Sequence, residues 1–289
     1  MSDVSRRDLR TISYTALALA AFAANSILCR IALRNSSIDP ATFSTIRLTA
    51  GAATLLLVTG LTRKDAAPVN ASWLSAGMLF LYAVPFSFAY TMLTTGTGAL
   101  ILFGSVQITM MAAALWSGER PHPLQWLGLG LALAGLVYLV LPGLEAPPIA
   151  GAAMMALAGF SWGVYSLRGR GAPNPLGQTT SNFVRSIPFV LAVSVIAFPR
   201  FHVERNGVLL AIASGAIASG VGYVVWYRAL QALSAARASI VQLLVPCLAA
   251  LGGVIFLAET ISLRLVMATV LILGGIALAL QSQARKRSP

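Results

Sequence analysis

The sequence contains few charged residues. Only 10% of its 289 residues are Asp, Glu, Lys or Arg, whereas 57% are hydrophobic and the mean hydropathy is +0.81. A soluble domain uses roughly a quarter of its residues as charged side chains to cover its surface. Lipid is therefore expected to cover most of this chain, and the composition indicates an integral membrane protein.

The chain also has little that could hold a metal or a disulfide framework. Its two cysteines, Cys29 and Cys247, lie inside apolar runs, and its two histidines, His122 and His202, lie near expected loops. Two distant cysteines do not form a disulfide framework, and two separated histidines lack metal-ligand spacing. The sequence therefore predicts no cofactor and no metal.

Acidic residues are missing from the middle of every long apolar segment. A proton-coupled exporter of cationic drugs needs a carboxylate within the membrane, so that mechanism is disfavoured. An intramembrane enzyme would need a nucleophile–base pair or a metal inside the spans, and the few acids and histidines lie at segment ends. No glycine loop of the Walker type is present, so ATP is not expected to drive the protein directly. The chain is not expected to be an enzyme.

Apolar runs separated by Pro, Gly or charge predict ten membrane-spanning helices, because about 20 apolar residues are needed to cross the hydrocarbon core. The connections are short, and none could form a soluble domain. The fold class is thus an all-α integral membrane protein. The predicted spans are residues 12–33, 40–60, 72–93, 97–117, 124–141, 149–167, 176–198, 207–230, 236–257 and 262–282.

Basic residues mark the ends of these runs. With both termini in the cytoplasm, the inside segments hold twelve Lys and Arg residues and the outside loops hold four. Cytoplasmic loops are enriched in these residues, so we expect a multi-pass protein of a bacterial inner membrane with both termini cytoplasmic. The net charge of +12 is explained by this topology, and no nucleic-acid partner is expected.

The two halves of the chain resemble one another. Residues 18–22 read ALAAF and residues 156–160 read ALAGF, an offset of 138. Matched Phe, Arg and Glu residues in the same order indicate an internal repeat. The pairs are Arg30 with Arg168, Thr42 with Thr180 and Arg47 with Arg185 at this offset, and Glu119 with Glu259 at an offset of 140.

Each half holds five predicted spans. Because five is odd, the second half would insert upside down relative to the first. Such inverted repeats are typical of secondary transporters, whose substrate site lies near the midplane between the halves. The expected organisation is a cytoplasmic lead (1–11), a first repeat (12–141), a connecting loop (142–148), a second, inverted repeat (149–282) and a basic cytoplasmic tail (283–289).

The layout of motifs resembles a known family. The first span carries Phe22-Ala23-Ala24-Asn25-Ser26 and Arg30, and Asp39-Pro40 and Arg47 follow. Over essentially the whole chain this resembles the EamA-type branch of the drug/metabolite transporter superfamily, and most closely the YddG-type exporters of aromatic and other neutral amino acids. The resemblance implies a ten-helix inverted-repeat carrier with a central cavity, which exports an amino acid or similar metabolite by alternating access. The expected partners are this small molecule and membrane lipid, and a monomer is compatible with the sequence, which does not give the oligomeric state.

Aromatic and amide side chains within the spans are the candidates for the substrate cavity. Tyr82, Phe86 and Tyr90 recur every four residues and so share one helical face. The repeat pairs span 1 with span 6 and span 3 with span 8, and an inverted axis would gather these four around one cavity. Aromatic walls with few polar groups suit a small neutral or amphipathic molecule. The predicted substrate-binding residues are Asn25, Tyr82, Phe86, Tyr90, Trp162, Tyr165, Tyr223 and Trp226.

Four charged residues are expected to be structural. Arg47 and Arg185 lie seven to nine residues inside their spans, where a cation is costly without a partner. They could clamp the repeat interface, and their matched positions favour that role, or they could bind an anion. Glu119 and Glu259 would accept N–H bonds at the start of the next helix. An anion-binding role would favour the alternative of a carrier or flippase for an anionic metabolite, nucleotide-sugar or lipid, and an intramembrane enzyme is the least favoured alternative.

Overall fold

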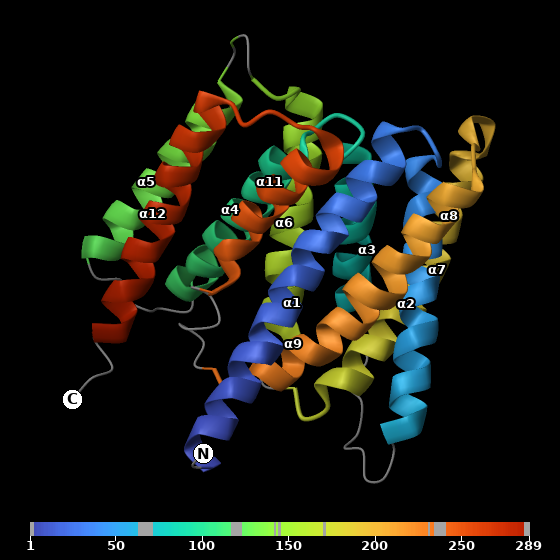
Figure 1. Ribbon diagram of the computed structural model, residues 1–289, viewed down its shortest axis with the longest axis horizontal. Helices are drawn as coiled ribbons and strands as arrows, with labels where there is room; N and C mark the ends of the chain where they lie inside the picture. The colour runs from blue at the N-terminus through green and yellow to red at the C-terminus, as the bar shows by residue number, and fades with distance from the viewer. Residues whose placement is uncertain are drawn as a thin grey trace.

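The chain is all-α in the part that the structure, a computed structural model, describes (Figure 1). Outside the helices, that part contains an isolated β-bridge between Ile38 and Val203. The described residues are 3–62, 72–116, 123–141, 143, 146–169, 172–230, 232–233 and 241–285.

The first half supplies five helices. They are α1 (Asp3–Arg34), α2 (Pro40–Thr62), α3 (Trp73–Ala89), α4 (Thr95–Trp116) and α5 (Pro123–Val140).

The second half begins with α6 (Ile149–Gly169) and α7 (Pro175–Ile196), followed by a short 3₁₀ turn (Phe198–Arg200). Three consecutive elements then form one uninterrupted helical segment: α8 (Arg205–Ile212), the π-helix η2 (Ala213–Val221) and α9 (Gly222–Leu230). The last helices are α11 (Leu244–Leu257) and α12 (Leu263–Arg285).

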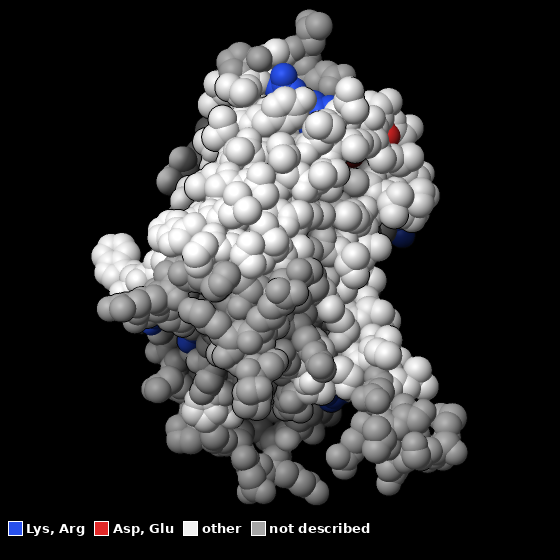
Figure 2. All heavy atoms as spheres, turned by 90° about the vertical axis from the view of Figure 1, so that its left-hand side faces the viewer, with Lys and Arg blue, Asp and Glu red and all other residues white. Residues whose placement is uncertain are grey.

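Length and composition make this a multi-pass membrane protein. Among the described residues, six helical segments are long and apolar enough to cross a membrane, and four shorter helices are also apolar. On the side where α5 and α12 lie, the described atoms form a broad band free of charge, and charged side chains, most of them basic, lie toward its edges (Figure 2). Exposed Leu127, Val137 and Val270 lie on these two helices, as expected for a surface in contact with lipid.

Most predicted spans coincide with helices to within a few residues, but three ends differ. The first helix begins at Asp3 rather than residue 12, and α3 ends at Ala89 rather than residue 93, because Tyr90–Thr94 turn the chain into α4. The ninth span was predicted from residue 236, whereas α11 begins at Leu244; residues 236–240 lie outside the described part.

Helix starts follow from local chemistry. The Asp39 carboxylate accepts hydrogen bonds from the backbone N–H groups of Ala41 (3.0 Å) and Thr42 (2.9 Å), and Pro40 opens α2 where no N–H is needed. The same arrangement recurs at α7, where Asn174 accepts a bond from the Gly177 N–H at 2.9 Å and Pro175 is the first helical residue. The capping residue and the proline together fix where these two helices begin.

The helices form two groups. The pair of helices α5 and α12 lies at one side, while the remaining helices surround the centre (Figure 1). Within this pair the backbones of Gly128 and Gly275 touch, since a Cβ on either would collide with the carbonyl oxygen of the other. α1 begins and α12 ends at the same end of the bundle (Figure 1).

Candidate functional site

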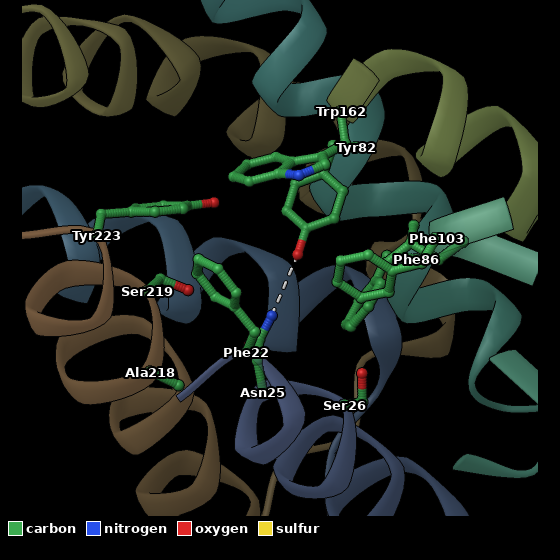
Figure 3. Close-up of a pocket in the computed structure, with 11 residues that line it drawn as sticks. Phe22, Asn25, Ser26, Tyr82, Phe86, Phe103, Trp162, Ala218, Ser219 and Tyr223 are labelled. Atoms are coloured by element: carbon green, nitrogen blue, oxygen red, sulfur yellow. Dashed lines mark hydrogen bonds between the residues drawn. The ribbon is translucent and has the colours of Figure 1, made fainter. Parts of the chain in front are cut away.

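A small pocket lies at the centre of the bundle and takes residues from both halves of the chain (Figure 3). Its volume is about 20 Å³, close to the space that one water molecule needs. Sites for organic molecules enclose several hundred cubic ångströms, so the helices must separate before such a molecule can enter. The lining residues are Phe22, Asn25, Ser26, Tyr82, Phe86, Leu102, Phe103, Trp162, Ala218, Ser219 and Tyr223.

Aromatic rings make up most of the wall. Trp162 stacks on Tyr223 with centroids 5.3 Å apart and an interplanar angle of 17°, and the Tyr82 ring lies 4.8 Å from Trp162. Phe22 meets Tyr223 at 6.1 Å, and Phe86 meets Tyr82 at 5.5 Å. These rings come from α1, α3, α6 and α9, so the wall joins the first half to the second.

A chain of hydrogen bonds crosses the polar side of the pocket. The Asn25 amide nitrogen donates to the Tyr82 hydroxyl at 3.2 Å, which is the dashed line in Figure 3. The Asn25 amide oxygen accepts a bond from the Ser214 hydroxyl at 2.5 Å. Asn25 is thus held between α3 and η2, with both ends of its amide used.

Arg47 lies directly behind this polar side. Its Nη2 atom donates to the Tyr82 hydroxyl at 3.0 Å and its Nε atom to the Ser219 hydroxyl at 3.4 Å. The guanidinium carbon is 5.1 Å from the Tyr82 ring centroid and 4.9 Å from that of Phe86. The side chain is 1% exposed. A cation is therefore buried one layer from the pocket, beside α3 and η2.

The close approach of α2 and η2 depends on glycine. A Cβ on Gly215 would collide with the backbone carbonyl of Arg47, and a Cβ on Gly51 would lie 3.2 Å from the carbonyl oxygen of Gly215. Small residues let these two backbones touch, and this contact brings Arg47 within reach of Ser219.

Five of the eight predicted substrate-binding residues line the pocket: Asn25, Tyr82, Phe86, Trp162 and Tyr223. They come from the first, third, sixth and eighth predicted spans. Whether these residues bind a substrate stays a prediction.

The other three predicted residues do not line this pocket. Tyr90 is fully buried at the end of α3, where its hydroxyl faces the Thr95 carbonyl at 3.4 Å. Tyr165 borders a second, smaller cavity with Asn182, and Trp226 packs on Phe22 away from the pocket. Periodicity predicted which residues share a helical face, but not how far along the helix the pocket extends.

Sequence reasoning missed the pocket residues of α4 and η2. Leu102 and Phe103 come from α4, and Ala218 and Ser219 come from a run of small residues in η2. Nothing in such a run distinguishes a lining hydroxyl from one that only packs against a helix. The glycines around Ser219 were the available signal, because they indicate a close approach of backbones.

The charged residues that were expected to be structural have different surroundings. Arg185 places its guanidinium 5.3 Å from the Trp73 ring centroid, a contact between the two halves. Glu259 accepts a bond from a helix start, but the N–H is that of Thr95 in α4 (2.8 Å) and not of the following helix α12. Glu119 lies outside the described residues.

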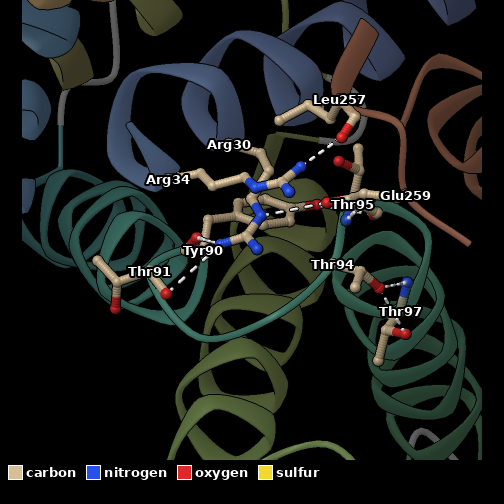
Figure 4. Close-up of polar contacts among 9 residues, drawn as sticks. All are labelled: Arg30, Arg34, Tyr90, Thr91, Thr94, Thr95, Thr97, Leu257 and Glu259. Carbon is tan, nitrogen blue, oxygen red and sulfur yellow. Dashed lines mark hydrogen bonds and ion pairs between the residues drawn. The ribbon is translucent and has the colours of Figure 1, made fainter. Parts of the chain in front are cut away.

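Arg30, which the sequence identified as a repeat match and as part of the family pattern, pairs with Glu259 at 3.2 Å (Figure 4). Its Nη1 atom also donates to the Tyr90 carbonyl at 2.7 Å. One turn further along α1, Arg34 donates to the Leu257 carbonyl. These contacts, the Arg30–Glu259 cluster, tie α1, the α3–α4 turn and the end of α11 together at one end of the bundle.

The described part of the chain has no group of three or more His, Cys, Asp or Glu side chains that could hold a metal ion. Both cysteines are free thiols. What the pocket offers chemically is aromatic surface, hydroxyl and amide groups, and one nearby cation.

Apolar helices around a small central pocket define the class of protein, a multi-pass membrane protein with a site enclosed between its helices. The model of the EamA-like transporter family matches residues 9–141 and again residues 149–281. The chain belongs to this family, whose members transport small molecules across membranes and are not enzymes.

Related proteins match this chain over more than two thirds of its length. An uncharacterised protein of Pseudomonas aeruginosa is 46% identical over 273 residues, which cover 94% of this chain and 95% of that protein. An uncharacterised transporter of Archaeoglobus fulgidus is 26% identical over 204 residues, covering 68% of this chain and 71% of the relative. A protein of known crystal structure has a TM-score of 0.64 at 21% identity, covering 91% of this chain and 98% of the other, and this likeness concerns the fold alone.

Proposed function

We propose that the chain is an alternating-access secondary transporter that exports neutral, aromatic amino acids or related small metabolites across a bacterial inner membrane. The observation that carries this proposal is the central pocket, whose wall is mostly aromatic and whose polar groups lie on one side. An amino acid with an apolar side chain has the same division between a polar and an apolar end. The export direction follows from the resemblance to the YddG-type exporters.

Alternating access between two inverted five-helix repeats is part of the proposal. It is supported by the two matches of the family model, one in each half, and by the pocket that both halves line. It is also supported by the positions of the ends of α1 and α12 at one end of the bundle (Figure 1). The cytoplasmic location of both termini rests on the distribution of Lys and Arg.

Flux through the purified protein tests the proposal. Liposomes that contain the protein should take up labelled L-phenylalanine and L-tryptophan faster than protein-free liposomes, and faster than they take up L-alanine. The same assay with and without a pH gradient reveals whether protons drive the transport. Absence of flux for every neutral amino acid would overturn the proposal.

A second candidate is a carrier of an anionic aromatic metabolite. The specific observation in its favour is Arg47, a buried cation beside the pocket without an ion-pair partner in the described part of the chain. Uptake of labelled 3-phenylpropionate without uptake of L-phenylalanine would support this candidate over the first.

A further inference from the structure

Arg47 is a buried charge that the described protein groups do not neutralise. Its Nη1 atom has no hydrogen-bond partner, while Nη2 and Nε reach only hydroxyl groups. The rings of Tyr82 and Phe86 give partial compensation through their π faces. An unpaired cation inside a membrane protein is costly and is typical of a functional site.

The acidic side chains that the structure describes are occupied elsewhere. Glu259 pairs with Arg30, and Glu204 lies at the surface beside His202. Asp39 caps the start of α2, eight residues before Arg47 and so about 12 Å away along the helix axis. None of these three carboxylates serves as the counter-ion of Arg47.

Two hydroxyls connect Arg47 to the pocket. The Tyr82 hydroxyl accepts two bonds, from Arg47 and from Asn25, so its own hydrogen is left to donate. The Ser219 hydroxyl accepts a bond from Arg47, and its hydrogen is likewise left to donate. Both residues line the pocket (Figure 3). A donor that itself accepts from a cation is polarised toward a stronger hydrogen bond.

We propose that Tyr82, Ser219 and Arg47 form a carboxylate subsite at the polar side of the pocket. Each carboxylate oxygen would accept one hydroxyl hydrogen, and the guanidinium behind them would supply the compensating charge. Arg47 would act through the two hydroxyls and is in that sense a positioning residue. This inference rests on the proposed function, to which it adds the substrate group that is recognised.

The subsite separates acids from their amides, because an amide has the same shape but no negative charge. Two matched pairs serve as probes: L-phenylalanine with L-phenylalaninamide, and 3-phenylpropionate with 3-phenylpropanamide. Binding is measured by calorimetry on the purified protein in detergent. Each acid is expected to bind at least about tenfold more tightly than its amide, the size of one hydrogen bond to a charged group.

Substitutions test which residues cause the preference for acids over amides. Arg47→Gln should remove the preference for the acids while leaving affinity for the amides within about twofold. The matched control is Arg185→Gln at the repeat-related position, where the guanidinium stacks on Trp73 and does not meet the pocket; this variant should keep the preference. Arg47→Lys should retain part of it, and Tyr82→Phe should weaken it without changing the buried charge.

The outcomes separate this inference from the proposed function. Equal binding of acid and amide in both pairs overturns the subsite, as does absence of binding by both acids, even when L-phenylalanine flux is normal. A preference for the acids that survives Arg47→Gln also overturns the subsite. If the Arg47→Gln variant does not fold, a preference that is unchanged in Tyr82→Phe overturns the subsite instead. Arg47-dependent binding of 3-phenylpropionate without flux of any neutral amino acid keeps the subsite and defeats the proposed function.

Discussion

Arg30 and Arg47 both lie in helices of the first half, Arg30 partly buried and Arg47 fully buried, yet their charges have different partners. Arg30 meets the Glu259 carboxylate at 3.2 Å and the Tyr90 carbonyl at 2.7 Å. Arg47 meets two hydroxyls and two aromatic rings, and one of its nitrogens has no partner. The first cation joins three parts of the chain at one end of the bundle, whereas the second lies against the central pocket.

This difference in partners indicates a structural role for Arg30 and a ligand-binding role for Arg47. A charge that is already neutralised by a protein carboxylate stabilises the arrangement of helices around it. A charge without a carboxylate costs stability until a negative group arrives. Substitutions at the first arginine and its partner should therefore change stability most, and substitutions at the second should change ligand preference most.

The largest effect on stability is expected for Glu259→Gln. The substitution keeps the shape of the side chain but leaves the Arg30 charge without a counter-ion, which should lower the free energy of unfolding by about 3 kcal/mol. Unfolding of the purified protein in detergent measures this loss.

The control for that prediction is Glu204→Gln, since Glu204 is 56% exposed and should contribute less than about 0.5 kcal/mol. The double variant Arg30→Gln/Glu259→Gln should recover part of the loss, because neither charge is then left alone. Wild-type stability in Glu259→Gln would mean that the pair does not hold the helices together.

A smaller effect, confined to transport, is expected for Trp162→Ala. Trp162 touches both Tyr82 and Tyr223, so its removal would take away the centre of the aromatic wall. Transport of L-phenylalanine should fall by roughly tenfold, the size of an aromatic contact and the apolar area it buries. Flux in liposomes, divided by the amount of folded protein, measures the change.

Trp116→Ala is the matched control, because Trp116 is 93% exposed at the end of α4. It should leave transport unchanged. If Trp162→Ala reduces the yield of folded protein and the flux equally, the residue has a structural role and not a role in the site.

A small change in stability is expected for Arg47→Met. The variant loses the cation–π contacts and the hydrogen bonds to Tyr82 and Ser219 but no longer buries an unpaired charge, so the free energy of unfolding without ligand should change by less than about 1 kcal/mol. The unfolding measurement used for Glu259→Gln applies here as well. A loss as large as that of Glu259→Gln would remove the distinction between the two arginines.

The helices could be predicted from the sequence because apolar length and proline positions act locally. The seventh span was predicted as 176–198 and the helix is Pro175–Ile196, where Asn174 and Pro175 fix its start. The pocket could be predicted only in part. Tyr82 and Phe86 line it, but Tyr90, on the same predicted face, lies beyond the end of α3.

The remaining features depend on contacts between distant segments. The pairing of Arg30 with Glu259 joins residues 229 positions apart, and a repeat match cannot reveal which partner each member has. The role of Ser219 depends on the glycine contacts that bring η2 against α2. A run of small residues predicts that backbones approach closely, but not which hydroxyl faces a cavity.

The π-helix η2 has a consequence for how the two repeats have diverged. The offset between the halves rises from 138 at Arg47 and Arg185 to 140 at Glu119 and Glu259, so the second half is two residues longer than the first in the interval that contains η2. A turn with i→i+5 bonds holds more residues than an α-helical turn, and such a segment accommodates insertions without moving the ends of a span.

At either offset, the position in the first half that corresponds to Ser219 is a leucine. Likewise, the position in the second half that corresponds to Tyr82 is a glycine. The family model matches both halves, but the side chains that the two halves place at the centre are not equivalent. Under the proposed function, a molecule with one charged end would therefore have a single favoured orientation in the pocket, whichever side of the membrane it enters from.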